Sequence, residues 1–126
     1  MTDAYQAVSA FKEYHFAACH QLKLEPPDHK CNSLHGHNYI VRVEVRGVID
    51  YAKGGVVILF EDIDKAVDPI IDYLDHSDLR EHFGLFGTAE SIAVYIYAKL
   101  VSALAPMPIR VTVNETPKAG ASVGAW

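Results

Sequence analysis

The sequence contains little cysteine, no long hydrophobic run and no excess of positive charge. Two cysteines among 126 residues are too few for a disulfide scaffold, so we expect reduced thiols and a cytoplasmic location. The longest apolar run, Ile92 to Ala98, has seven residues, whereas a membrane-spanning helix needs about 20. Residues 1–5 show no signal-peptide pattern. The 16 acidic and 11 basic residues give a net charge of −5, which argues against a general nucleic-acid or anionic-membrane surface.

What is present is an ordinary globular composition with one unusual feature. Half of the residues are hydrophobic and 21% are charged, and the sequence shows no repeat, low-complexity segment or linker. We therefore expect a single domain over residues 1–126. The unusual feature is histidine: seven are present, and the positions of several of them point to chemistry.

The hydrophobic pattern changes period along the chain and predicts its elements. Alternation with period two indicates strands, and recurrence at three and four residues indicates helices. The expected strands are 8–22, 37–49, 109–115 and 121–126, and the expected helices are 60–74 and 88–105. We expect Pro69 to interrupt or kink the first helix and Thr88 to cap the second.

This order, β-β-α-α-β-β, predicts an α+β fold in which two helices cover one face of an antiparallel sheet. The exposed edges of such a sheet make pairing with other subunits an expectation.

A His-x-His pair opens the second predicted strand and is a candidate metal site. In extended backbone the imidazoles of His35 and His37 project from the same face. His20, at the end of the first strand, is the best candidate for a third ligand, because pairing of the two strands would place it nearby. Three histidines with no fourth protein ligand are typical of a catalytic zinc ion. The alternative is a pair of ordinary surface or core histidines, against which the nearby Cys31 and the position of His20 argue.

The dipeptide Asp75–His76 lies where the first helix should end. An aspartate can orient an imidazole and stabilise its protonated form. Adjacent residues of a helix do not face each other, so a direct contact requires a non-helical turn. The alternative is a solvated helix end, where a protonated His76 would suit the helix dipole.

Two further residues are candidates for acid–base chemistry or binding. Cys31 follows Lys30, and a nearby cation favours the reactive thiolate, so it is a candidate general base. Its alternatives are a fourth zinc ligand or an inert thiol, whereas Cys19 is interpreted as a packed small residue. Glu115 ends the core-facing alternation of the last-but-one predicted strand, and a carboxylate at such a position needs a partner. It can accept a planar pair of N–H groups from a ligand. The alternative is that the strand ends there and the Glu115 side chain is solvated.

Taken together, these segments resemble the 6-pyruvoyl-tetrahydropterin synthase family over nearly the whole length. The resemblance is greatest to its bacterial branch, the 6-carboxy-5,6,7,8-tetrahydropterin synthases of queuosine biosynthesis. The segments that carry it are FAACH at 16–20, HKCNSLHGHNY at 29–39, LDH at 74–76, TAE at 88–90 and VNET at 113–116. The short chain and the Cys-x-x-x-His-Gly-His spacing favour the carboxy branch over the longer animal enzymes.

The resemblance implies a fold, a metal and an assembly. The implied fold is the tunnelling fold (T-fold), whose subunits associate into a barrel, and the implied assembly is a homo-oligomer, expected to be a hexamer of two stacked trimers. Zinc is implied at His20, His35 and His37, with active sites between subunits.

The implied reaction converts 7,8-dihydroneopterin triphosphate and water to 6-carboxytetrahydropterin, acetaldehyde and triphosphate. In it Cys31 is the base, His76 oriented by Asp75 shuttles protons, and Glu115 anchors the pterin. The alternatives are a 6-pyruvoyl-tetrahydropterin synthase, which keeps the carbon chain, and a non-catalytic pterin- or metal-binding module.

Two residues depart from the family pattern. Leu59 stands where many relatives carry Asp or Asn before the first helix, so a polar contact should be lost. Gly87 stands where Pro often precedes Thr88, and we expect it to loosen that turn. On charge alone, the candidates for contacting a triphosphate are Lys23, Lys30 and Lys118.

Overall fold

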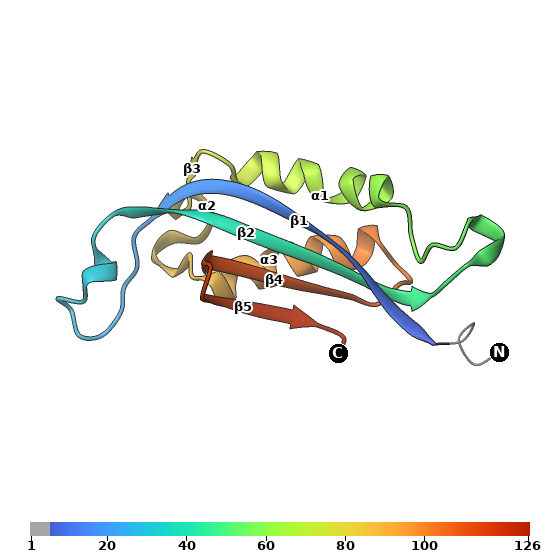
Figure 1. Ribbon diagram of the computed structural model, residues 1–126. Helices are drawn as coiled ribbons and strands as arrows, with labels where there is room; N and C mark the ends of the chain where they lie inside the picture. The colour runs from blue at the N-terminus through green and yellow to red at the C-terminus, as the bar shows by residue number, and fades with distance from the viewer. Residues whose placement is uncertain (1–5) are drawn as a thin grey trace.

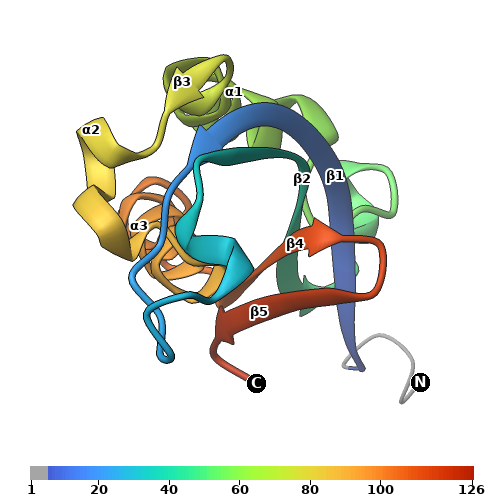
Figure 2. The ribbon, with the colours of Figure 1, turned by 90° about the vertical axis from the view of Figure 1, so that its left-hand side faces the viewer.

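The computed structural model describes residues 6–126 and shows a curved sheet with helices on one face (Figures 1 and 2). Residues 1–5, on which the signal-peptide expectation rests, lie outside the described part. The strands are β1 (Ala7–His20), β2 (His35–Val48), β3 (Ser77–Asp78), β4 (Ile109–Thr116) and β5 (Ala119–Gly124). The helices are α1 (Phe60–Leu74), α2 (Arg80–Phe83) and α3 (Ala89–Ala103), with 3₁₀ turns at Lys30–Asn32, Tyr51–Lys53 and Gly84–Phe86.

The five strands form one sheet in the order β3-β1-β2-β4-β5. All pairings are antiparallel except β1 with β3, which is parallel and involves only Ala18 and Cys19 of β1. The predicted α+β order is therefore confirmed, with β3 and the four-residue α2 as additions that the hydrophobic pattern did not indicate.

The buried core lies between the sheet and the two long helices. Alternate residues of β1, β2 and β4 are buried, which is the period expected of a sheet covered on one face. On α1 the buried residues recur at helical spacing, and α1 runs without interruption through Pro69 to Leu74. The largest fully buried side chains include Tyr39, Ile63, Leu74, Leu79, Ile92, Ile96, Leu100 and Ile109.

The two long helices begin differently. Thr88 caps α3, because its side chain accepts a hydrogen bond from the Ser91 backbone N–H at 3.1 Å. Leu59 occupies the cap position of α1, and its side chain makes no such bond. No helix within residues 6–126 combines the length and the apolar character needed to cross a membrane.

The long connection between β1 and β2 projects beyond one end of the sheet (Figure 1). It contains the 3₁₀ turn η2 (Lys30–Asn32), and it returns the chain so that β2 pairs with β1 along fourteen residues, Ala7 with Val48 through His20 with His35. This register decides which side chains meet at the loop end of the sheet.

Candidate metal centre

The strand register brings the three predicted histidine ligands together. His20 pairs directly with His35, and His37 pairs with Ala18, two residues before His20 on the same face. One nitrogen from each ring lies within 4.8 Å of the others, and the Nε2 atoms of His20 and His35 are 2.9 Å apart. The predicted cluster is therefore present.

Backbone carbonyl groups orient two of these rings. His20 Nδ1 lies 2.7 Å from Gly87 O, and His35 Nδ1 lies 2.6 Å from Ser33 O. A carbonyl oxygen only accepts, so each Nδ1–H donates and each neutral ring presents the lone pair of Nε2. Two such lone pairs facing each other at 2.9 Å repel, and a cation between them removes the repulsion.

His37 completes the group and supplies an unpartnered nitrogen. Its Nε2 is buried and has no hydrogen-bond partner, and the nearest carboxylate oxygen, of Glu115, is 3.7 Å away. Burial lowers the pKa of His37, an effect that Glu115 opposes and that His20 and His35 reinforce. A neutral imidazole is the form that binds a metal, so the three histidines fit a metal ion such as zinc.

Cys31 lies beside this group but is not among the possible ligands. The cluster within residues 6–126 that could hold a metal consists of the three histidines alone. Cys31, on η2, lines a cavity of about 290 Å³ with Lys30, His35 and His37. The thiol therefore shares the space in front of the candidate metal ligands, where a base is useful and a fourth ligand is not required. Lys23 and Lys118, the other cations considered for a triphosphate, are exposed.

The Asp75–His76 contact exists because the chain leaves the helix at that point. Asp75 is extended, and His76 has a positive φ of 58°, which is the non-helical turn that the contact requires. Asp75 Oδ1 accepts from the Ala17 backbone N–H at 2.9 Å, and Oδ2 lies 2.9 Å from His76 Nδ1. The bond from Ala17, and then the contact with His76, lower the pKa of Asp75.

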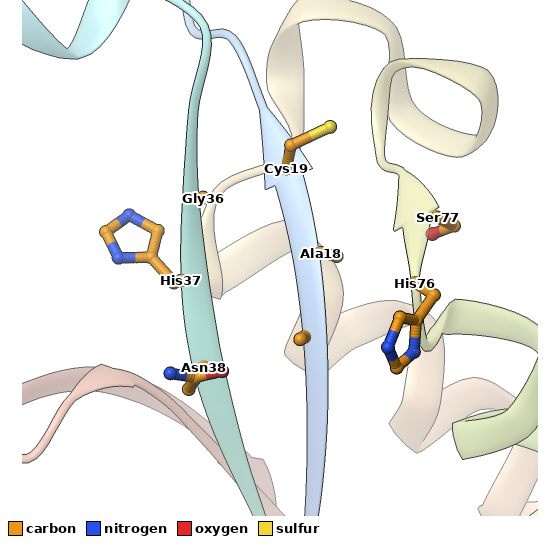
Figure 3. A pocket seen from close by; sticks show the side chains of 8 residues that line it. Ala18, Cys19, Gly36, His37, Asn38, His76 and Ser77 are labelled. Carbon is orange, nitrogen blue, oxygen red and sulfur yellow. The ribbon is translucent and has the colours of Figure 1, made fainter.

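Within one chain, the structure does not bring this pair to the three histidines. His76 is 83% exposed and lines a cavity of about 620 Å³ whose wall also includes Cys19, Gly36, His37 and Asn38. Figure 3 shows the ring of His37 beside β2 and the ring of His76 beside β1, with the two strands between them.

Glu115 lies where β4 leaves regular pairing and faces the histidine cluster. The β4–β5 register shifts between Asn114 and Thr116, and the Glu115 side chain is 27% exposed. It lines a cavity of about 170 Å³ that Glu90, at the start of α3, also lines. Glu115 is thus not a fully solvated strand end.

Sequence reasoning missed the contact between the backbone of Gly87 and the candidate ligand His20. Its φ of −78° is an ordinary conformation, and its carbonyl accepts the Nδ1–H of His20. A carbonyl contact leaves no residue-type signal in a sequence, so the Thr88-Ala89-Glu90 segment and the departure at Gly87 pointed to this turn but not to the contact with His20.

The comparisons with known proteins agree with this geometry. Residues 9–125 match the family model described as 6-pyruvoyl tetrahydropterin synthase. A 6-carboxy-5,6,7,8-tetrahydropterin synthase of Synechocystis sp. is 39% identical over 113 residues, which cover 84% of each chain. A 6-pyruvoyl tetrahydrobiopterin synthase of Poecilia reticulata is 38% identical and covers 82% of this chain and 80% of that protein.

A solved structure shows the same fold. The 6-pyruvoyl tetrahydropterin synthase of Caenorhabditis elegans superimposes with a TM-score of 0.82 at 29% identity, covering 98% of this chain and 99% of that one. The predicted T-fold is confirmed, and the oligomeric barrel stays a prediction.

Proposed function

This chain belongs to the 6-pyruvoyl tetrahydropterin synthase family, and on that basis we propose that it is a zinc-dependent enzyme acting on 7,8-dihydroneopterin triphosphate. The observation that carries the proposal is the convergence of three histidine nitrogens within 4.8 Å beside a free thiol. The proposed location is the cytoplasm, for which the two free cysteines are the support.

The proposed product is 6-carboxytetrahydropterin, released with acetaldehyde and triphosphate, as a step toward queuosine. The Cys-x-x-x-His-Gly-His spacing at 31–37 favours this reaction. The candidate alternative is the 6-pyruvoyl reaction, which eliminates triphosphate and keeps the carbon chain. Relatives named for the two reactions are 39% and 38% identical, so overall similarity does not separate them.

The proposed metal ion would be held by Nε2 of His20 and His35 and by one ring nitrogen of His37. When bound, it would supply Lewis acidity to the oxygens of the substrate side chain. The protein contributes by fixing the rings through Gly87 and Ser33, which keeps both Nδ1 protons away from the metal.

In this proposal Cys31 acts on the side chain of the substrate, and Glu115 binds its pterin ring. Cys31, which shares a cavity with His35 and His37, removes a proton from a side-chain carbon held in front of the metal. The carboxylate of Glu115 accepts a pair of N–H groups from the pterin edge, a match of two parallel hydrogen bonds. Its distance of 3.7 Å from His37 Nε2 supports a pterin site next to the proposed metal centre.

The Asp75–His76 pair is proposed to come from a neighbouring copy in a homo-oligomer, expected to be a hexamer of two stacked trimers. Asp75 holds the Nδ1–H of His76, so the ring presents Nε2 to give or take a proton on the other side of the substrate. Its 83% exposure and its place beside the outer edge of β1 support a role toward another chain.

Product analysis tests the reaction. The purified protein, with its zinc content measured, is incubated with 7,8-dihydroneopterin triphosphate, and the products are identified by mass. We expect acetaldehyde and 6-carboxytetrahydropterin. A pyruvoyl product without acetaldehyde would establish the alternative reaction, and neither zinc nor product would leave a non-catalytic binding module.

Replacement of Cys31 tests its role as base. Cys31→Ala should abolish turnover while one metal ion per chain stays bound, because the thiol lies outside the group of possible ligands. Full activity in this variant would show that Cys31 is not the base, and loss of the metal would make it a ligand.

A further inference from the structure

A chain of side-chain hydrogen bonds connects the segment after His76 to the turn that carries Cys31. It begins at Asp78 of β3, whose carboxylate holds the guanidinium of Arg80. Arg80 Nη2 donates to Asp78 Oδ2 at 2.7 Å, Arg80 Nε lies 3.1 Å from both carboxylate oxygens, and the Arg80 backbone N–H donates to Oδ1 at 3.0 Å. This fork-to-carboxylate contact fixes the plane of the guanidinium.

The other terminal nitrogen of Arg80, Nη1, contacts Gln21. Arg80 Nη1 donates to Gln21 Oε1 at 3.0 Å, and Gln21 Nε2 donates to the backbone O of Asn32 at 2.9 Å. Gln21 directly follows the candidate ligand His20, and Asn32 directly follows Cys31. One glutamine amide therefore connects the ion pair to the turn, with its acceptor and its donor both in use.

The side chain of Asn32 forms its hydrogen bonds with other residues of the β1–β2 loop. Its Oδ1 accepts from the Leu24 N–H at 2.7 Å, and its Nδ2 donates to Leu24 O at 3.0 Å and to Pro27 O at 3.1 Å. These bonds fold the loop on itself, whereas the contact from Gln21 and a 3.3 Å bond from the Leu22 N–H to Cys31 O tie the turn to the end of β1.

We propose that Arg80 and Gln21 are positioning residues for Cys31, which hold η2 so that the thiol stays in front of the three histidines. The inference rests on the proposed function, in which Cys31 is the base. Misplacement of a catalytic group by about 1 Å can cost about 100-fold in rate, so hydrogen bonds that fix the position of Cys31 affect turnover.

The same contacts contribute little to folding. The side chains of Arg80 and Asp78 are 40% and 27% exposed, and exposed ion pairs add at most about 1 kcal/mol to stability. Loss of the tie should therefore lower activity without unfolding the protein.

Gln21→Glu is the sharpest test, because it keeps the shape and the acceptor for Arg80 but removes the donor to Asn32 O. We expect kcat to fall about 10- to 100-fold with little change in KM and with one metal ion per chain retained. Amide hydrogen exchange at Asn32 and Ser33, whose N–H groups bond to His29 O and Lys30 O, should become faster. Arg80→Lys, which keeps the charge but not the fork, should have a smaller effect in the same direction.

Lys65→Met is the matched control, since it breaks an exposed ion pair with Asp62 on α1 and should leave kcat and exchange unchanged. A Gln21→Glu enzyme with wild-type kcat, unchanged exchange at Asn32, or metal loss equal to its activity loss would overturn the inference. If the wild-type protein forms no pterin product, the proposed function fails. The exchange measurement then tests by itself whether Gln21 holds the turn, since faster exchange supports the inference and unchanged exchange overturns it.

Discussion

A histidine has two ring nitrogens, and its hydrogen bonds decide which of them faces a metal ion. Here the carbonyl groups of Gly87 and Ser33 take the Nδ1 protons of His20 and His35, so that both Nε2 atoms point inward. His37 has no such partner at Nε2, which is buried close to the other two rings. The residues present fit a three-histidine metal site on the geometry of this chain alone.

Removal of any one of these rings should remove the metal. We expect His20→Ala, His35→Ala and His37→Ala each to weaken zinc binding by more than the roughly 10- to 100-fold that loss of an outer partner costs. Zinc should raise the melting temperature of the wild type and not of these variants, since only a bound ligand stabilises the folded state. Competition with a chromophoric chelator measures the affinity. His15→Ala, an exposed histidine of β1, is the control, and equal loss there would contradict the assignment.

Asp75 should make stability depend on pH in the acid range. Its folded pKa lies below the unfolded value of about 3.9, so its stabilising contribution is present above pH 4 and is lost as the pH falls through that range. The free energy of unfolding of Asp75→Asn should therefore lie below that of the wild type at pH 6, with a smaller gap at pH 3. Both proteins are measured by urea unfolding in chelator, so that metal release does not contribute.

Asp72→Asn, at an exposed position of α1, is the control for that measurement. Its difference from the wild type in free energy of unfolding should not become smaller between pH 6 and pH 3. A gap for Asp75→Asn that is equal at both pH values would show that the carboxylate does not carry the effect.

The sequence predicted the site residues well where residue type carries the chemistry. The spacing of His35 and His37, the place of His20 and the need for a non-helical turn at His76 were all readable from the pattern, and the structure shows each. The Gly87 carbonyl and the contact from Gln21 to Asn32 O were not readable, because backbone acceptors have no residue signature and depend on how distant segments meet. The catalytic roles of Cys31, Asp75 and His76 stay predictions, as do the binding of zinc by the three histidines and of the pterin by Glu115.

At the scale of elements, the start of α1 is less well capped than the start of α3. Leu59 has the extended conformation of a cap residue and is 46% exposed, but its side chain accepts no bond from the first turn. Leu59→Asp should raise the free energy of unfolding by about 1 kcal/mol, because a carboxylate there can accept a first-turn N–H. The free energies of unfolding of Leu59→Asp and Leu59→Ala are compared by chemical unfolding. The alanine variant gives the effect of losing the leucine side chain, and the difference between the two variants gives the effect of the cap. An aspartate variant no more stable than the alanine variant would contradict the expectation.

The long elements were predictable and the short ones were not. The bounds of α1 matched the apolar spacing from Phe60 to Leu74, because its buried face repeats over four turns. β3 has two residues and exists because the chain passes alongside Ala18 and Cys19 after the turn at His76. Period-two alternation cannot be recognised in two residues, and the pairing depends on tertiary contacts that no local pattern reports.

At the scale of the whole molecule, the strand pair β1–β2 separates the ring of His37 from the ring of His76 (Figure 3). Cys31 lines a cavity with His35 and His37, whereas His76 lies beside the outer edge of β1, where its N–H bonds to Ala17 O. The outer edge of β1 is paired only at Ala18 and Cys19 within the described residues, which leaves most of a fourteen-residue strand open to another chain. Both features favour an assembly in which one copy completes the site of the next.

Mixed assemblies test this arrangement directly. Cys31→Ala and His76→Ala should each be inactive alone, but co-expressed chains should regain about a quarter of wild-type activity if each site takes Cys31 from one copy and His76 from another. Turnover per chain is measured on the mixture and on each variant. A mixture of Cys31→Ala with His37→Ala is the matched control and should recover nothing, because those two residues line one cavity of a single chain. No recovery in the first mixture would mean that each chain uses its own His76.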